Sequence, residues 1–271
     1  MPHSHRPHIL VTNDDGIGSP GLLALKDALS QVGRVAVLAP TRSWSASGHV
    51  KTMHKPLRVD EVRLADDTPA LATNGAPSDA VVLAFLGLVE HPIDLVVSGI
   101  NPGANLGHDV TYSGTVTAAM EGAIAGVPAI AVSVDSRTPS DFGPAAHWAA
   151  EVTRMVWRFG LPRETLLNVN VPALSLERIA GVLITRMGMR IYRDELVRRI
   201  DPRGRPYYWI GGSAPTGVEE EGTDIWAVAH GYVSVTPLQL DLTAHHLLST
   251  LREWPLPVES AFRRTDDQGS Y

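Results

Sequence analysis

The chain has 271 residues, with 23 Lys and Arg against 29 Asp and Glu, and its formal net charge is −6 at pH 7. Its hydrophobic content of 44% and charged content of 19% are ordinary for a globular protein with one sizeable core. The acidic charge argues against a nucleic-acid polymer as partner, and the absence of cysteine excludes disulfides, thiolate metal sites and cysteine nucleophiles. We therefore expect a cytoplasmic protein with no membrane partner, in which oxygen or imidazole ligands hold any metal.

The first half of the chain alternates short apolar runs with helical patterns, which is typical of βαβ units around a mainly parallel sheet. Residues 9–11 form an uninterrupted apolar run, which predicts a strand buried on both faces. Ser19 and Pro20 are then expected to begin a helix. Further strands are expected at 35–38, 95–97, 129–134 and 166–171, and further helices at 81–89, 115–125 and 145–159.

The pattern changes near Arg186. Residues 190–208 are charged and aromatic, 211–221 are expected to form a polar loop, and 226–235 alternate like antiparallel strands. We assign residues 1–186 to an α/β catalytic core. We assign residues 187–271 to a C-terminal arm that packs on the core or on another subunit.

Ligands of open α/β sheets bind beyond the carboxyl ends of the strands. Asp14 and Asp15, within an Asn-Asp-Asp-Gly sequence, directly follow the first predicted strand. Adjacent carboxylates repel each other and are costly to bury, and a hard cation such as Mg²⁺ or Mn²⁺ relieves both effects. The same four residues are also typical of a side-chain-stabilised turn. Their position at the end of a strand favours the metal.

Residues 16–21, GIGSPG, match the G-x-G-x-x-G fingerprint of dinucleotide-binding proteins. The acidic residue that would bind the ribose about twenty positions on is missing. Arg42 could serve a ribose phosphate, so an NADP-dependent oxidoreductase remains an alternative. The explanation we prefer is that the glycines allow a tight turn beneath a metal.

Ser113, Gly114 and Thr115 precede a predicted helix, and their hydroxyls and free backbone N–H groups suit an oxyanion or phosphate. An ordinary helix cap explains the same residues. No P-loop, G-x-S-x-G or H-E-x-x-H motif occurs in the sequence. Carboxylates, amides, hydroxyls and a helix N-terminus together predict metal-assisted phosphoryl hydrolysis. A non-catalytic nucleotide-binding module is the second alternative.

Six runs of sequence, in a fixed order over nearly the whole chain, carry a family resemblance. They are residues 9–16, 39–49, 98–101, 103–116, 168–172 and 231–237. The chain resembles the SurE family, the stationary-phase survival proteins, which are metal-dependent 5′/3′-nucleotidases. The resemblance implies a three-layer α/β/α, Rossmann-like core. It also implies a C-terminal oligomerisation arm exchanged between the subunits of a homodimer, often paired into a homotetramer.

The resemblance also implies a site. The ligands of one divalent cation would be Asp14, Asp15, Ser45 and Asn101. The candidate phosphate- or substrate-binding residues are Asn101, Asn105, Ser113, Gly114 and Thr115. The expected reaction converts nucleoside 5′- or 3′-monophosphates to nucleoside and phosphate, with short polyphosphate left open as a further substrate. If a protein base assists, Asp14 or Asp15 is nearest in sequence, and these two are the catalytic candidates.

One loop departs from the family pattern. Family members usually carry Gly-Thr-Pro-x-Asp-Cys where residues 75–80 of this chain read Gly-Ala-Pro-Ser-Asp-Ala. Ala76 therefore removes a hydroxyl from this loop, together with any substrate contact that the hydroxyl would make.

Overall fold

The computed structural model describes residues 5–254 except 46 and 91. The chain divides into a compact unit that ends at Leu240 and a second unit that begins at Asp241. The described part of the second unit contains a 3-10 turn, His245–Leu247, and the short helix α6, Leu248–Arg252. No helix among the described residues combines the length and apolar character needed to cross a membrane.

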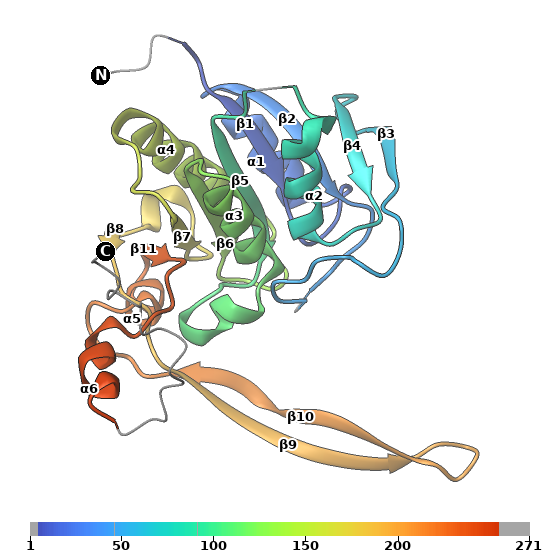
Figure 1. Ribbon diagram of the computed structural model, residues 1–271, viewed down its shortest axis with the longest axis vertical. Coiled ribbons are helices and arrows are strands. Elements are labelled where there is room, and N and C mark those ends of the chain that lie inside the picture. The colour runs from blue at the N-terminus through green and yellow to red at the C-terminus, as the bar shows by residue number, and fades with distance from the viewer. Residues whose placement is uncertain (1–4, 46, 91, 255–271) are drawn as a thin grey trace, which may run out of the picture. The chain divides into compact units, whose positions relative to one another are not determined.

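The first unit is built on one large sheet. Its strands are β1 His8–Thr12, β2 Arg34–Pro40, β3 Val59–Arg63, β4 Pro69–Thr73, β5 Leu95–Pro102, β6 Ala129–Val134, β7 Thr165–Val171, β8 Gly181–Ile184 and β11 Tyr232–Gln239. Their spatial order is β3-β4-β2-β1-β5-β6-β7-β11-β8 (Figure 1). Neighbours pair in parallel except β3 with β4 and β7 with β11.

Helices cover both faces of this sheet. They are α1 Pro20–Ser30, α2 Pro77–Leu83, α3 Gly114–Ile124, α4 Gly143–Phe159 and α5 Asp224–Ala229, with shorter helical turns η1 Ala84–Leu88, η2 Gly107–Tyr112 and η3 Leu176–Arg178. Along β1, Ile9 and Val11 enter the core that contains α1 and α4, whereas Leu10 enters the core that contains α2 and α3. This alternation fits a strand buried on both faces. The predicted α/β/α core with a mainly parallel sheet is confirmed.

The region predicted as one arm, 187–271, is described as far as residue 254, and these described residues fall into three different parts. The strands β9, Arg190–Ile200, and β10, Pro206–Gly217, pair with each other as a separate antiparallel hairpin. Figure 1 shows this hairpin projecting from the sheet. The strand β11 instead lies between β7 and β8 in the main sheet. The third part begins at Asp241, and exchange between subunits stays a prediction.

Two local predictions in this region are wrong. Residues 211–217 were expected in a polar loop but complete β10, where they face β9 across a ladder with one bulge. Residues 226–229 were expected in a strand but belong to α5. The Thr223 side chain caps this helix by accepting a hydrogen bond from the N–H of Trp226 at 3.2 Å. A Thr-Asp pair at a helix start is the signal that the alternating pattern concealed.

The glycine fingerprint has a packing explanation. A Cβ on Gly21 would overlap the carbonyl oxygen of Ile100, so α1 approaches β5 as closely as it does only with glycine there. Gly16 has a φ of +103°, a backbone conformation that favours glycine. Gly18 faces open space, with nothing within 4 Å of a Cβ added to it.

Gly21→Ala and Gly18→Ala form a matched pair that separates packing from dinucleotide binding. We expect Gly21→Ala to lower the free energy of unfolding by about 1–3 kcal/mol, because the backbone oxygen of Ile100 must move. Gly18→Ala should change it by less than about 0.5 kcal/mol. Denaturant unfolding of both variants measures these differences. Equal destabilisation by the two substitutions would contradict the packing explanation.

Candidate functional site

The side chain of Asn13 closes the turn after β1. Its Oδ1 accepts a hydrogen bond from the N–H of Gly16 at 3.2 Å, and its Nδ2 donates to the Gly16 carbonyl at 3.0 Å. The turn and metal interpretations of this sequence therefore apply to different residues. Asn13 forms the turn, and the carboxylates of Asp14 and Asp15 are left for other partners.

Asp14 lies against the N-terminus of α3. Its side chain is buried, and its Oδ1 accepts a hydrogen bond from the Thr115 hydroxyl. A Cβ on Gly114 would lie 2.9 Å from the other oxygen, Oδ2, so glycine allows the helix to come this close. Burial raises the pKa of Asp14 above its ordinary value, and the hydrogen bond from Thr115 opposes this rise.

Asp15 is half-buried beside it. Its Oδ2 is buried and has no hydrogen-bond partner among the residues that the structure describes. Burial, followed by the negative charge of Asp14, raises the pKa of Asp15 to about 7. An unpartnered carboxylate oxygen next to a second buried carboxylate fits a hard divalent cation, which would supply the missing positive charge.

The loop after β2 brings Ser45 to the same edge of the sheet. The N–H of Trp44 donates to the main-chain carbonyl of Asp14 at 2.7 Å. Ser45 therefore directly follows a residue that is hydrogen-bonded to Asp14. Ser45 is exposed, and its hydroxyl lies 2.9 Å from that of Ser43.

Asn101 and Ser113 reach this edge from two other elements. Asn101 lies at the end of β5, which pairs with β1, and its Nδ2 donates to the Gly103 carbonyl at 2.6 Å. This bond commits the amide nitrogen, and the side-chain oxygen is the atom that suits a hard cation. The Ser113 hydroxyl accepts from the N–H of Val116 at 3.1 Å, which confirms the helix-cap interpretation. Its own hydrogen can still be donated to a ligand.

Asn105 was expected to face the substrate, and its contacts are internal. Its Nδ2 donates to the Ser133 hydroxyl at 2.8 Å, and its N–H donates to Asn170 Oδ1 at 2.8 Å. Its carbonyl accepts from Nδ2 of Asn168 and of Asn170. These bonds fix the segment before η2 to β6 and β7, and a substrate role for Asn105 stays a prediction. The signal missed was the alternation of Asn and Val in β7.

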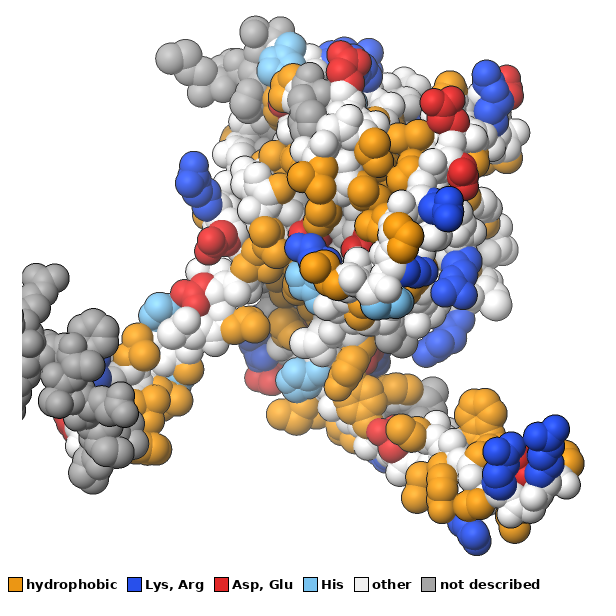
Figure 2. Space-filling model, turned by 45° about the vertical axis from the view of Figure 1, so that its right-hand side comes forward, with side chains coloured by type: hydrophobic (Ala, Val, Ile, Leu, Met, Phe, Trp, Pro, Cys, Tyr) orange, Lys and Arg blue, Asp and Glu red, His pale blue; other side chains and the backbone are white. Residues whose placement is uncertain are grey.

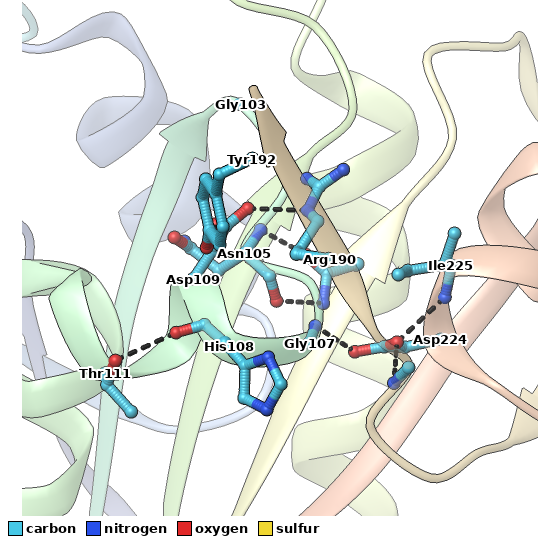
Figure 3. A network of polar contacts seen from close by, with 12 residues as sticks. Gly103, Asn105, Gly107, His108, Asp109, Thr111, Arg190, Tyr192, Asp224 and Ile225 are labelled. Carbon is cyan, nitrogen blue, oxygen red and sulfur yellow. Dashed lines mark hydrogen bonds and ion pairs between the residues drawn. The ribbon is translucent and has the colours of Figure 1, made fainter. Parts of the chain in front are cut away.

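Sequence reasoning also missed Asp224, which is fully buried at the start of α5. Its carboxylate accepts hydrogen bonds from the N–H groups of Gly107, Gly188 and Ile225, at 2.8, 2.7 and 2.8 Å (Figure 3). One side chain therefore joins η2, the base of the hairpin and α5. Nothing in the local sequence distinguishes it from an exposed helix-start aspartate.

Asp109 of η2 binds the first residues of the hairpin (Figure 3). It accepts from Arg190 Nε at 2.7 Å and from the Tyr192 hydroxyl. Burial and the hydrogen bond to Asp109 raise the pKa of Tyr192 to about 12. Because η2 leads directly into Ser113, the hairpin base and the helix N-terminus at the site share one segment of chain.

The carboxylate set is small. Among the described residues, no three His, Asp or Glu side chains gather in a way that could hold a metal ion. A cation at this edge would therefore rest on two carboxylates and on neutral oxygens. The donor set Asp14, Asp15, Ser45 and Asn101 stays a prediction.

The dinucleotide alternative finds little support in the geometry. Arg42 could have served a ribose phosphate. Its guanidinium carbon Cζ instead lies over the Trp44 ring, 5.4 Å from the ring centroid. Gly16 and Gly21 are accounted for by turn geometry and packing.

Comparisons with known proteins found similar sequences and a similar fold. The family model described as "Survival protein SurE" matches residues 9–194. A protein named "5′-nucleotidase SurE" from Herpetosiphon aurantiacus is 58% identical over 238 residues, which cover 87% of this chain and 93% of the relative. A protein of the same name from Chloroflexus aggregans is 54% identical over 249 residues, which cover 91% of this chain and 98% of the relative. The crystal structure of the SurE protein from Aquifex aeolicus superposes with a TM-score of 0.78 at 44% identity, over 91% of this chain and 98% of that one.

The carboxylate pair predicts a pH-dependent loss of stability in metal-free protein. Because the pKa of Asp15 is raised to about 7, the folded state keeps a proton that the unfolded state has released. Stability from this group is therefore present below about pH 4 and is lost as the pH rises to about 7. Asp15→Asn should raise the melting temperature in EDTA, by a margin that grows over this interval.

Asp60→Asn is the matched control, because it removes the same charge from an exposed position of β3. Thermal unfolding of wild type and both variants across this pH range measures the effect. If the rise in melting temperature caused by Asp15→Asn is constant with pH, or equal to that caused by Asp60→Asn, the raised pKa of Asp15 is contradicted.

Proposed function

The chain belongs to the SurE family, and from this premise we propose that it is a nucleotidase that hydrolyses nucleoside monophosphates with one divalent cation at the carboxyl ends of β1, β2 and β5. The observation that carries the proposal is the pair of a buried Asp14 and a half-buried Asp15, with one carboxylate oxygen of Asp15 unpartnered among the described residues. The name of the relatives, 5′-nucleotidase, supports the reaction. Action on 3′-monophosphates and short polyphosphate belongs to the same proposal.

The ligands of the cation would be Asp14, Asp15, Asn101 and Ser45. When bound, the cation supplies positive charge at the phosphoryl oxygens and makes a water easier to deprotonate. The Thr115 hydroxyl is already donated to Asp14, so its contribution is to orient that carboxylate.

The phosphate would lie at the N-terminus of α3. There the helix dipole, the backbone N–H group of Gly114 and the hydroxyl of Ser113 would attract its oxygens, while the backbone N–H of Thr115 is bound to the Asp14 carboxylate. Water attacks phosphorus, the bond from phosphorus to the ribose oxygen breaks, and that oxygen takes up a proton as the nucleoside leaves. Asp14 and Asp15 are our candidates for accepting the proton that the water gives up.

The NADP-dependent oxidoreductase and the non-catalytic binding module make different predictions. The first requires tight, metal-independent binding of NADPH, which a fluorescence titration measures. The second requires nucleotide binding without phosphate release. Phosphate release from a panel of 5′- and 3′-monophosphates and short polyphosphate, with Mg²⁺ or Mn²⁺, therefore separates all three.

Removing either carboxylate should abolish turnover. We expect Asp14→Asn and Asp15→Asn to lower kcat/KM for nucleoside monophosphates by more than about 100-fold, above the effect typical of residues outside the ligand shell. EDTA should do the same to wild type, and added Mn²⁺ or Mg²⁺ should restore it. Circular dichroism shows whether the variants are folded, and Asp60→Asn should retain wild-type rates. Full activity in the double Asn variant would contradict the metal assignment.

We also propose that the protein is a homodimer or homotetramer assembled through its hairpin. A two-stranded hairpin alone is at best marginally stable, and this one exposes large apolar side chains. Leu196 and Ile210 face each other across the strands and are 72% and 81% exposed. Figure 2 shows hydrophobic side chains along the hairpin and basic side chains towards its tip. A cytoplasmic location belongs to the proposal and is supported by the absence of cysteine.

Deleting the hairpin tests the assembly. Replacing residues 191–216 by a short Gly-Ser linker keeps β11 and Asp224, so the sheet should still fold while the oligomer dissociates. The double variant Leu196→Ser, Ile210→Ser should have the same effect, whereas Arg203→Ser in the exposed turn between the strands should not. Light scattering gives the mass of each variant. An unchanged mass after deletion would show that assembly, if any, uses another surface.

A further inference from the structure

The loop that carries Ser45 is attached to one face of α3. The N–H of Gly48 donates to the carbonyl of Tyr112 at 3.0 Å, just before the helix begins. The Thr117 hydroxyl donates to the carbonyl of Gly48 at 3.1 Å. Both main-chain groups of one loop residue are therefore bound to α3 or to the residue that leads into it.

Glu121 makes a further attachment one helical turn along. It is four residues after Thr117, and residues at this spacing lie on the same helix face. Its side chain is 7% exposed, and its Oε1 lies 2.8 Å from His49 Nε2, which donates to it. Lys51 Nζ approaches the same oxygen at 3.8 Å. Both nitrogen partners of this buried carboxylate come from the Ser45 loop.

The same helix also fixes Asp14. Thr115 donates its hydroxyl to the Asp14 carboxylate, while the main-chain carbonyl of Asp14 accepts from Trp44 in the loop. The loop, the carboxylate segment and α3 thus form a closed circuit of hydrogen bonds. Loss of the bond between His49 and Glu121 would leave this stretch of the loop attached to α3 through Gly48 alone, and would loosen the loop on the side that follows Ser45.

We propose that His49 and Glu121 are positioning residues that hold the Ser45 loop against α3, and thereby set the affinity of the site for its cation and for the substrate phosphate. This inference rests on the proposed function, because it assigns an effect on ligands that neither side chain touches. The proposal explains why a carboxylate is buried at Glu121, which the packing of α3 alone does not explain.

Hydrogen exchange in metal-free protein tests the attachment. Glu121→Ala and His49→Ala should speed amide exchange in residues 43–51 by about tenfold or more, since they remove one of the loop's bonds to the helix. His49→Gln should keep exchange near the wild-type rate, because the glutamine Nε2 can donate in place of the histidine Nε2. Unchanged exchange in both alanine variants would overturn the proposal.

Cation affinity and steady-state kinetics test the consequence for the site. The alanine variants should bind Mn²⁺ about 10- to 100-fold more weakly in a calorimetric titration, which is the usual effect of partners outside the ligand shell. KM for a nucleoside monophosphate should rise by a similar factor, with kcat changed less than about threefold, and His49→Gln should restore both. The control is Asp66→Ala, which breaks an ion pair with Lys26 and touches neither α3 nor the loop.

The outcomes separate this proposal from the proposed function. Wild-type turnover and cation binding that persist unchanged in Glu121→Ala and His49→Ala would overturn only the positioning role. If Asp66→Ala loses as much cation affinity as those variants, the effect is general destabilisation, and the positioning role is also overturned. Absence of cation binding and phosphate release in wild type would overturn the proposed function, and the positioning role with it.

Discussion

The hydrogen bond from Thr115 to the buried carboxylate of Asp14 is the contact on which this edge of the sheet depends. A carboxylate removed from water requires compensation, and here it comes from the first turn of a helix that belongs to a different βαβ unit. Gly114 allows the helix to approach closely enough for that bond. The contact therefore fixes where α3 begins relative to β1. The groups that we propose for phosphate binding and the carboxylates that we propose as metal ligands take their relative positions from it.

The features found from the sequence were those that short stretches of chain specify. The run at 9–11 is apolar enough to require burial on both faces, so a strand and the edge beyond it followed directly. Asp14 and Asp15 were conspicuous because charges at such a point are costly. Ser45 came only from the family resemblance, since an exposed serine in a polar loop carries no signal of its own.

The features that sequence analysis missed depend on partners that are distant in the sequence. Asp224 is buried because it satisfies N–H groups near residues 107 and 188, and its neighbours in sequence reveal neither. Residues 211–217 are rich in glycine and include a proline, which favours a loop, yet they form a strand because β9 provides the pairing that composition alone cannot predict. Asn168 and Asn170 interrupt an apolar strand to bind the backbone of Asn105, more than sixty residues earlier. In each case long-range hydrogen bonding determines the structure, and the local sequence propensity does not predict it.

The bonds from Asp109 to Arg190 and Tyr192 join the hairpin to the segment that runs into Ser113. A partner subunit bound to the hairpin would restrict this segment, and a phosphate at the start of α3 would restrict it from the other end. Because binding free energies are linked reciprocally, whatever assembly does for phosphate affinity, phosphate must do equally for assembly. In an oligomer built through the hairpin, dilution and substrate concentration would then act as two controls on a single equilibrium.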